Sequence, residues 1–227
     1  MNNPNRTILY WDSFNQPDEL GPYMRFRLTY EGELISTQED DQPSSVREDR
    51  RRKQKHALRK WFHPQLKHLW ATHPMLKTKN NISSANGENY LDKTAKDFAG
   101  WGYNYVPVLK KGDQAICHIE TLFLRRQMPG GLIRGGDLDN RMKTLYDSLR
   151  MPSSPAEMKD IAGPDENEKP FLVLLEEDNL ITHTAIETDI LLDLPINNSD
   201  AEMNRVRLIM TVTISPYGGS LESVDWV

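Results

Sequence analysis

Alternating apolar and polar positions predict three half-buried β-strands in this chain. The alternation has the two-residue period of a strand with one face against a core. It is clearest near the C-terminus, where Val206, Leu208, Met210, Val212 and Ile214 alternate with Arg207, Thr211 and Thr213. The three segments are 23–30, 115–123 and 205–214. Three further segments, 103–109, 171–175 and 181–190, predict three more strands.

Two segments have helical spacing instead. The first is predicted to begin at Ser45, which stands three residues before Glu48 as in a capping box, and to extend to about Trp70. We expect Pro64 to split or kink this helix, because proline cannot donate the internal hydrogen bond. The second helix is predicted to start near Asp139 and to bury an apolar stripe formed by Leu138, Met142, Leu145 and Leu149.

The remaining segments indicate loops around a single domain. Residues 77–100 are rich in Asn, Ser, Lys and Gly, which predicts an irregular insertion, and 151–170 contains four prolines and several acids, which predicts another. Strands with few intervening helices indicate an α+β fold, with a mostly antiparallel sheet and helices packed on one face. We therefore expect one domain over 1–227 with an N-terminal extension and these two insertions.

The overall charge argues against a protein that coats nucleic acid through bulk positive charge. There are 28 Lys and Arg against 33 Asp and Glu, giving a net charge of −5. Residues 47–60 are locally basic, which fits either a solvated helix face or a contact to DNA. The single cysteine, Cys117, excludes an internal disulfide and is compatible with a reducing compartment. The N-terminus lacks the layout of a secretory signal and no apolar segment has the length of a membrane span, so we expect a cytoplasmic protein.

The candidate chemistry lies in the segment Gly136–Leu149. Asp137 and Asp139 can converge if the chain turns between them, and a third oxygen ligand is predicted from the acidic triplet Glu176–Asp178, which follows the strand 171–175. Hard oxygen ligands without clustered Cys or His favour Mg²⁺, with Mn²⁺ as a substitute. Such a site suits phosphodiester hydrolysis.

Lys143 lies one helical turn beyond Asp139 and can stabilise charge on a phosphate in the transition state. Structural roles compete with this interpretation. Asp137 or Asp139 also fits a helix N-cap, although capping does not explain Asn140 and Lys143. Asp147 is spaced for a salt bridge to Lys143, and the acidic triplet fits an exposed turn.

The pattern Asp137-x-Asp139-Asn140-x-x-Lys143, followed by an acidic pair after a short apolar strand, resembles the RusA family of Holliday junction resolvases. The resemblance implies a homodimer that binds four-way DNA junctions and makes paired nicks with Mg²⁺ in DNA recombination and repair. By motif position, the family's catalytic and metal-binding aspartates fall on Asp137, Asp139 and Asp178, and its functional lysine on Lys143. The segment between the helix and the second acidic cluster is expanded in this chain, which leaves Glu177 as an alternative third ligand.

Four arginines flank the predicted site and are candidates to hold the DNA backbone: Arg125, Arg126, Arg134 and Arg141. The glycine pairs nearby are not followed by the Gly-Lys-Ser/Thr of a phosphate-binding loop, so no nucleotide cofactor is expected. Two alternatives remain open. One is a non-catalytic DNA-binding or assembly protein of the same fold, and the other is a nuclease for a different branched or single-stranded DNA.

Overall fold

The computed structural model describes residues 24–35, 43–81, 87–126, 137–193 and 204–216. The helices are α1 (Ser44–Thr72), α2 (Pro74–Asn81), α3 (Tyr90–Asp97) and α4 (Asp137–Leu149). The strands are β1 (Met24–Glu33), β2 (Ala99–Gly100), β3 (Tyr103–Leu109), β4 (Ala115–Arg125), β5 (Phe171–Leu175), β6 (Ile181–Ile190) and β7 (Arg205–Pro216). Short 3₁₀ turns lie at Lys111–Asp113, Pro155–Met158, Glu166–Glu168 and Asp178–Leu180.

The strands form two mixed sheets. In the larger sheet, with the order β1-β7-β4-β6, β7 is antiparallel to both of its neighbours, whereas β4 and β6 are parallel. The smaller sheet has the order β2-β3-β5 and pairs β3 with β5 in parallel. The predicted α+β class is confirmed, but its strands are divided between two sheets of mixed direction. The alternation in the sequence sets which face of a strand is buried and does not encode the direction of its neighbour.

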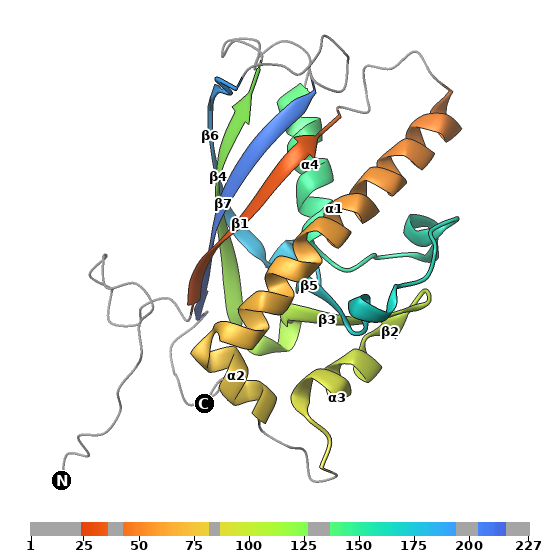
Figure 1. Cartoon of the computed structure of the whole chain (residues 1–227), viewed down its shortest axis with the longest axis vertical. Coiled ribbons are helices and arrows are strands. Elements are labelled where there is room, and N and C mark those ends of the chain that lie inside the picture. Colours follow the sequence, from red (N-terminus) through yellow and green to blue (C-terminus); the bar gives the residue numbers. More distant parts are fainter. Residues whose placement is uncertain (1–23, 36–42, 82–86, 127–136, 194–203, 217–227) are drawn as a thin grey trace, which may run out of the picture.

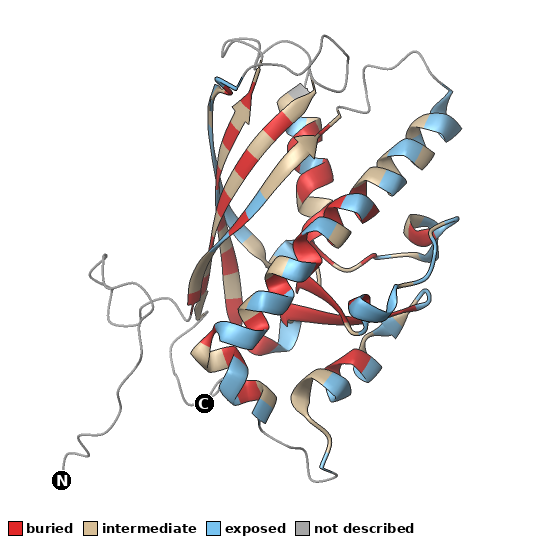
Figure 2. Ribbon diagram, viewed as in Figure 1, coloured by how far each residue is buried: buried red, intermediate tan, exposed pale blue. Residues whose placement is uncertain are grey.

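One face of the four-stranded sheet carries the core. α1 and α4 pack over this face, and none of the helices in the described residues lies on the opposite face of the sheet (Figure 1). Buried and half-exposed residues alternate along β4 and β7, as the sequence predicts (Figure 2). Leu28, Leu58, Phe123 and Leu145 belong to the core cluster that joins β1, α1, β4 and α4. Burial of this apolar surface is the main favourable term in folding.

The long helix α1 departs from expectation at two places. Its N-cap is Pro43, without a side-chain cap, so the predicted Ser45–Glu48 capping box is wrong. The helix also continues without a break through Pro64, which is exposed to solvent. Phe62 and Leu66, on either side of it, are 2% and 1% exposed, and their burial offsets the one lost hydrogen bond. Of the helices in the described ranges, none has both the length and the apolar character needed to cross a membrane.

The predicted irregular insertion at 77–100 is wrong over most of its length, because the structure has α2, α3 and β2 there. Asn89 caps α3 by accepting a hydrogen bond from the backbone N–H of Asp92 at 2.8 Å. Leu76 and Ala95 are 0% and 6% exposed, so both short helices are held by the core. Burial of these apolar side chains against the rest of the fold stabilises both helices despite the polar composition of the segment.

We expect Cys117 to be inert toward thiol reagents in the native protein. Burial raises the pKa of its thiol to about 12, and the side chain is 0% exposed within β4. The reactive thiolate is therefore nearly absent at neutral pH. Incubation with a chromogenic disulfide reagent should release no colour until denaturant is added. Rapid reaction of the folded chain would contradict the buried placement of β4.

Candidate functional site

The helix α4 is positioned by its apolar stripe. Met142, Leu145 and Leu149 are 3%, 0% and 0% exposed, which fixes the rotation of the helix on the sheet. Tyr146 faces Thr121 of β4 and Thr184 of β6. The predicted stripe at these positions is confirmed, and it determines which polar residues of α4 can reach solvent.

Asp139 and Lys143 lie on the solvent side of the first two turns of α4. Both side chains are exposed, and their spacing of four residues places them on the same face of the helix. The helix begins at Asp137, two residues earlier than predicted, so Asp139 is a residue of the first turn and not an N-cap. Asp137 is placed by its backbone alone, and its side chain lies outside the part of the chain that the structure describes. An acid in the first turn is favoured by the helix dipole.

The acidic triplet after β5 has three different environments. Glu176 accepts a hydrogen bond from the backbone N–H of Lys111 at 2.8 Å, and Glu177 forms an ion pair with the ammonium of the same lysine. The Asp178 side chain is 58% exposed, and its carboxylate lies 3.7 Å from Nε of Arg150. Because both glutamates are held by Lys111, Asp178 is the member of the triplet that is most open to a ligand.

Within one chain, Asp139 and Asp178 lie toward opposite ends of α4. The backbone N–H of Met151, just beyond the helix, donates to Leu175 at the end of β5 at 3.0 Å, which places the triplet near the C-terminal end of α4. The ten residues from Asp139 to Leu149 span about 15 Å at 1.5 Å per residue. Oxygen ligands of one Mg²⁺ lie about 2.1 Å from the ion, so the two carboxylates do not converge inside one protomer.

Asp147, two turns beyond Asp139, belongs to a cluster of charges between α1 and α4. Its carboxylate lies 3.4 Å from Nζ of Lys55 and 3.4 Å from Nη2 of Arg150, and these partners replace the expected salt bridge to Lys143. The Arg59 side chain, on α1, is fully buried and donates to the carbonyl of Asp147 at 2.9 Å. Asp147 therefore joins two helices and is not available to a metal site.

Glu157, in the 3₁₀ turn Pro155–Met158, is the anion at the centre of the same cluster. It lies 2.9 Å from Arg59, 3.0 Å from Arg150 and 3.8 Å from Lys55. Burial alone raises its pKa, but the neighbouring cations and a hydrogen bond from Ser153 outweigh burial and lower the pKa to about 2. This residue lies in the segment predicted as a loop, and it fastens that loop to α1 and α4.

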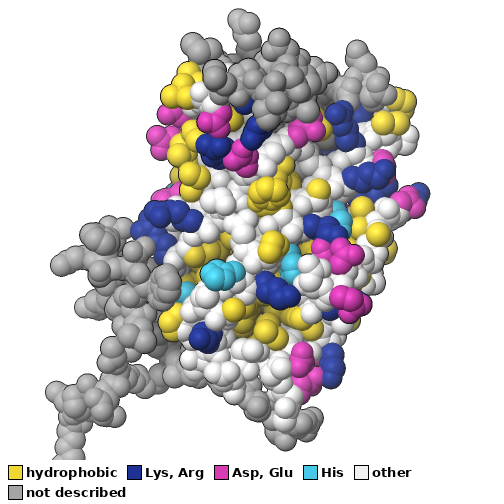
Figure 3. Space-filling model, in the orientation of Figure 1, with side chains coloured by type: hydrophobic (Ala, Val, Ile, Leu, Met, Phe, Trp, Pro, Cys, Tyr) yellow, Lys and Arg dark blue, Asp and Glu magenta, His cyan; other side chains and the backbone are white. Residues whose placement is uncertain are grey.

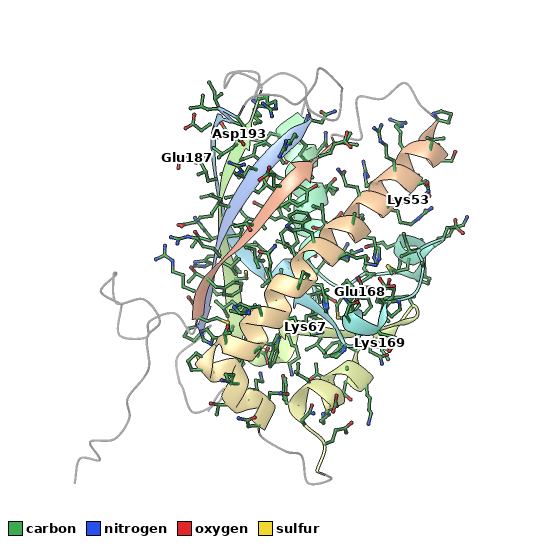
Figure 4. The ribbon with its side chains drawn as sticks, viewed as in Figure 1. Lys53, Lys67, Glu168, Lys169, Glu187 and Asp193 are labelled. Carbon is green, nitrogen blue, oxygen red and sulfur yellow. The ribbon has the colours of Figure 1, made fainter. Side chains whose placement is uncertain are left out.

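The basic segment 47–60 is therefore partly structural. Lys60 forms ion pairs with Asp165 and Glu168, and Arg52 with Asp49 and Asp160. Basic side chains that reach the surface are spaced along α1 in Figure 3, and Lys53 projects from its N-terminal part in Figure 4. The sequence alone could not identify these ion pairs, because residue spacing does not show which residues of 147–168 lie against α1.

The four arginines predicted to bind DNA differ in accessibility. Arg125 and Arg141 are 4% and 5% exposed, and Arg141 donates to the side chain of Asn204 at 3.2 Å. Arg126 donates to the backbone carbonyl of Asp193. Arg134 lies outside the described residues. Arg125 and Arg141 are therefore buried in the fold, and contact of the four arginines with DNA stays a prediction.

Two open hollows in the described surface lie elsewhere. Both are open grooves beside α1, one lined by Trp61, Arg205 and Arg207 and the other by Phe26 and His68. None of the predicted acids or Lys143 lines either groove. Among the described residues, no group of three or more His, Cys, Asp or Glu side chains is arranged to hold a metal ion.

No family model, curated protein or solved structure matched this chain.

Proposed function

We propose that the protein is a Mg²⁺-dependent endonuclease for branched DNA of the RusA type, which acts on four-way junctions as a homodimer. The observation that carries the proposal is the exposed pair Asp139 and Lys143 on the first two turns of α4. Among the described side chains, neither has an ion-pair partner. The other polar residue of this face, Asp147, forms an ion pair with Lys55 of α1. A carboxylate and an ammonium group left open on one helix face suit a substrate phosphate and its metal ion.

Because Asp139 and Asp178 lie apart within one protomer, we expect the dimer to bring them together across its interface. If a two-fold axis crosses α4 near its middle, the N-terminal end of the helix in one protomer lies beside the C-terminal end in its partner, because the interface of a two-fold dimer is the same patch on both copies. Asp139 of one protomer then meets the exposed Asp178 of the other. Each dimer has two such sites, one for each opposed strand of a junction.

The residues have separate roles in this proposal. Asp139 and Asp178 would hold Mg²⁺, which polarises a phosphoryl oxygen and supplies a hydroxide nucleophile at neutral pH. Lys143 neutralises charge on the phosphate, and the N-terminus of α4 adds a favourable field for an anion. Neither Glu176 nor Glu177 takes part, because both are held by Lys111.

The direct test is incubation of the full chain with a labelled synthetic four-way junction and Mg²⁺, with linear duplex of the same sequence as the control substrate. We expect paired nicks in the junction and none in the duplex, and no cleavage in the presence of a chelator. Light scattering should give the mass of a dimer. Absence of cleavage on every branched substrate, with the protein folded, would overturn the assignment to nucleases.

One observation favours a second function, a DNA-binding or assembly protein without catalysis. In a single protomer the acids do not converge, so a monomer would lack the third ligand. Calorimetric titration with Mn²⁺ separates the two functions. Binding that disappears in Asp139→Asn supports the nuclease, whereas junction binding without any heat from Mn²⁺ supports the second function.

A further inference from the structure

Two histidines lie side by side on the face of the larger sheet that no helix covers. His118 of β4 and His183 of β6 are directly paired in the parallel register, and their ring centroids are 5.4 Å apart with an interplanar angle of 59°. His118 is half-buried and His183 is exposed. The pair stands at the opposite end of the strands from Glu187 and Asp193, which mark the upper end of the sheet in Figure 4.

An irregularity in β6 creates this pair. Cys117 pairs with Ile181, but the next residue, His118, pairs with His183, so Thr182 is an extra residue in the strand. In a regular parallel register His118 would have Thr182 as its neighbour. The extra residue places His183 beside His118. β-Bulges change the direction in which a side chain points in this way.

The separation of the rings fits a shared metal ion. Two imidazoles that bind one tetrahedral ion at a metal–nitrogen distance of about 2.1 Å have ring centroids roughly 5 Å apart. The two residues lie on adjacent paired strands, so the sheet holds their backbones side by side.

The other histidines do not offer such a pair. His56, His63 and His73 are buried in or beside α1, and burial lowers the pKa of each. His68 is exposed on α1. All six histidines of the chain lie within the described residues, and the only ring contact between two of them there is His118 with His183.

We propose that His118 and His183 form a bidentate site for a borderline divalent transition cation, Zn²⁺, Cu²⁺ or Ni²⁺. Imidazole nitrogen is the ligand these ions prefer, whereas Mg²⁺ prefers oxygen. The site is separate from the acids of α4 and does not depend on the proposed nuclease activity. Two protein ligands leave further coordination positions open to water or to an anion.

The test is calorimetric titration of the full chain with Zn²⁺ in the presence of excess Mg²⁺, which occupies sites that prefer oxygen ligands. We expect one equivalent of Zn²⁺ per chain. The variants His118→Gln and His183→Gln should each weaken binding by about tenfold or more. His68→Gln, which changes an exposed histidine on α1, is the matched control and should bind as the unmodified protein does.

A second readout identifies the ligands. Electron paramagnetic resonance of one equivalent of Cu²⁺ should show nitrogen coordination that disappears in the double variant H118Q/H183Q. Unchanged Zn²⁺ affinity in this double variant, or no Zn²⁺ binding by the folded unmodified chain, would overturn the proposal. Junction cleavage with Mg²⁺ is expected to be the same in H118Q/H183Q, so loss of the nuclease assignment and loss of the histidine site are distinguishable results.

Discussion

Asp139→Asn is expected to reduce Mg²⁺-dependent cleavage of a four-way junction by about 100-fold or more. The substitution removes one ligand charge from the proposed site, and loss of about 3 kcal/mol of transition-state stabilisation corresponds to that factor. Because Asp139 is exposed on α4, the free energy of unfolding should change by no more than about 0.5 kcal/mol. The measurement is the single-turnover cleavage rate at saturating enzyme, together with urea unfolding of the same preparation.

The matched control is Asp97→Asn, an exposed aspartate of α3 that forms an ion pair with Lys93. It makes the same chemical change at a site without a predicted role, and we expect the cleavage rate to be unchanged. Equal rates for Asp139→Asn and Asp97→Asn would remove Asp139 from the site. A stability loss in Asp139→Asn as large as its activity loss would assign the residue to folding instead.

The largest effect on stability is expected at Glu157. Glu157→Gln leaves Lys55, Arg59 and Arg150 in one cluster without the carboxylate that all three contact. Loss of one partner from a buried ion cluster costs about 3 kcal/mol, because the remaining charges stay desolvated. Urea unfolding at neutral pH should show this difference. Glu166→Gln, an exposed residue paired with Lys169, is the control and should change stability by less than about 1 kcal/mol.

Glu157 also makes the free energy of unfolding depend on pH, in a direction that follows from its lowered pKa. The pKa of Glu157 is lowered from 4.5 to about 2 in the folded chain, and its side chain is 13% exposed. The carboxylate therefore stabilises the fold above the unfolded pKa of 4.5, and this contribution is lost as pH falls from 4.5 toward 2. The contribution is on the order of 3 kcal/mol. The stability difference between the unmodified chain and Glu157→Gln should shrink over this pH range, and a constant difference would contradict the cluster.

The strands and the two main helices could be predicted because their signals are local. Alternation in β4 and β7 and the stripe Met142, Leu145 and Leu149 report burial directly, and both appear in the structure. The helices α2 and α3 could not be predicted in the same way. Their sequences are polar, and Leu76 and Ala95 become core residues only through contacts with distant parts of the chain.

The candidate site was predictable in its residue types and not in its geometry. The motif at 137–143 identifies a helix start that carries an acid and a lysine on one face, and the structure places Asp139 and Lys143 there. Whether Asp178 lies at the near or the far end of α4 depends on the pairing of Arg150 and Met151 with Leu175, which no local pattern encodes. The ion pair between Asp147 and Lys55 could not be predicted for the same reason, because the two residues are 92 positions apart in the sequence.

Complementation between two inactive variants shows whether each site is shared between two protomers. Asp139→Asn and Asp178→Asn are each purified, mixed, allowed to exchange protomers and assayed for nicking of a labelled junction. If each site takes Asp139 from one protomer and Asp178 from its partner, a mixed dimer keeps one intact site, and the mixture should nick one strand although neither variant does so alone. If the mixture is as inactive as its components while co-purification of differently tagged variants shows that mixed dimers have formed, the shared site at the two ends of α4 is wrong.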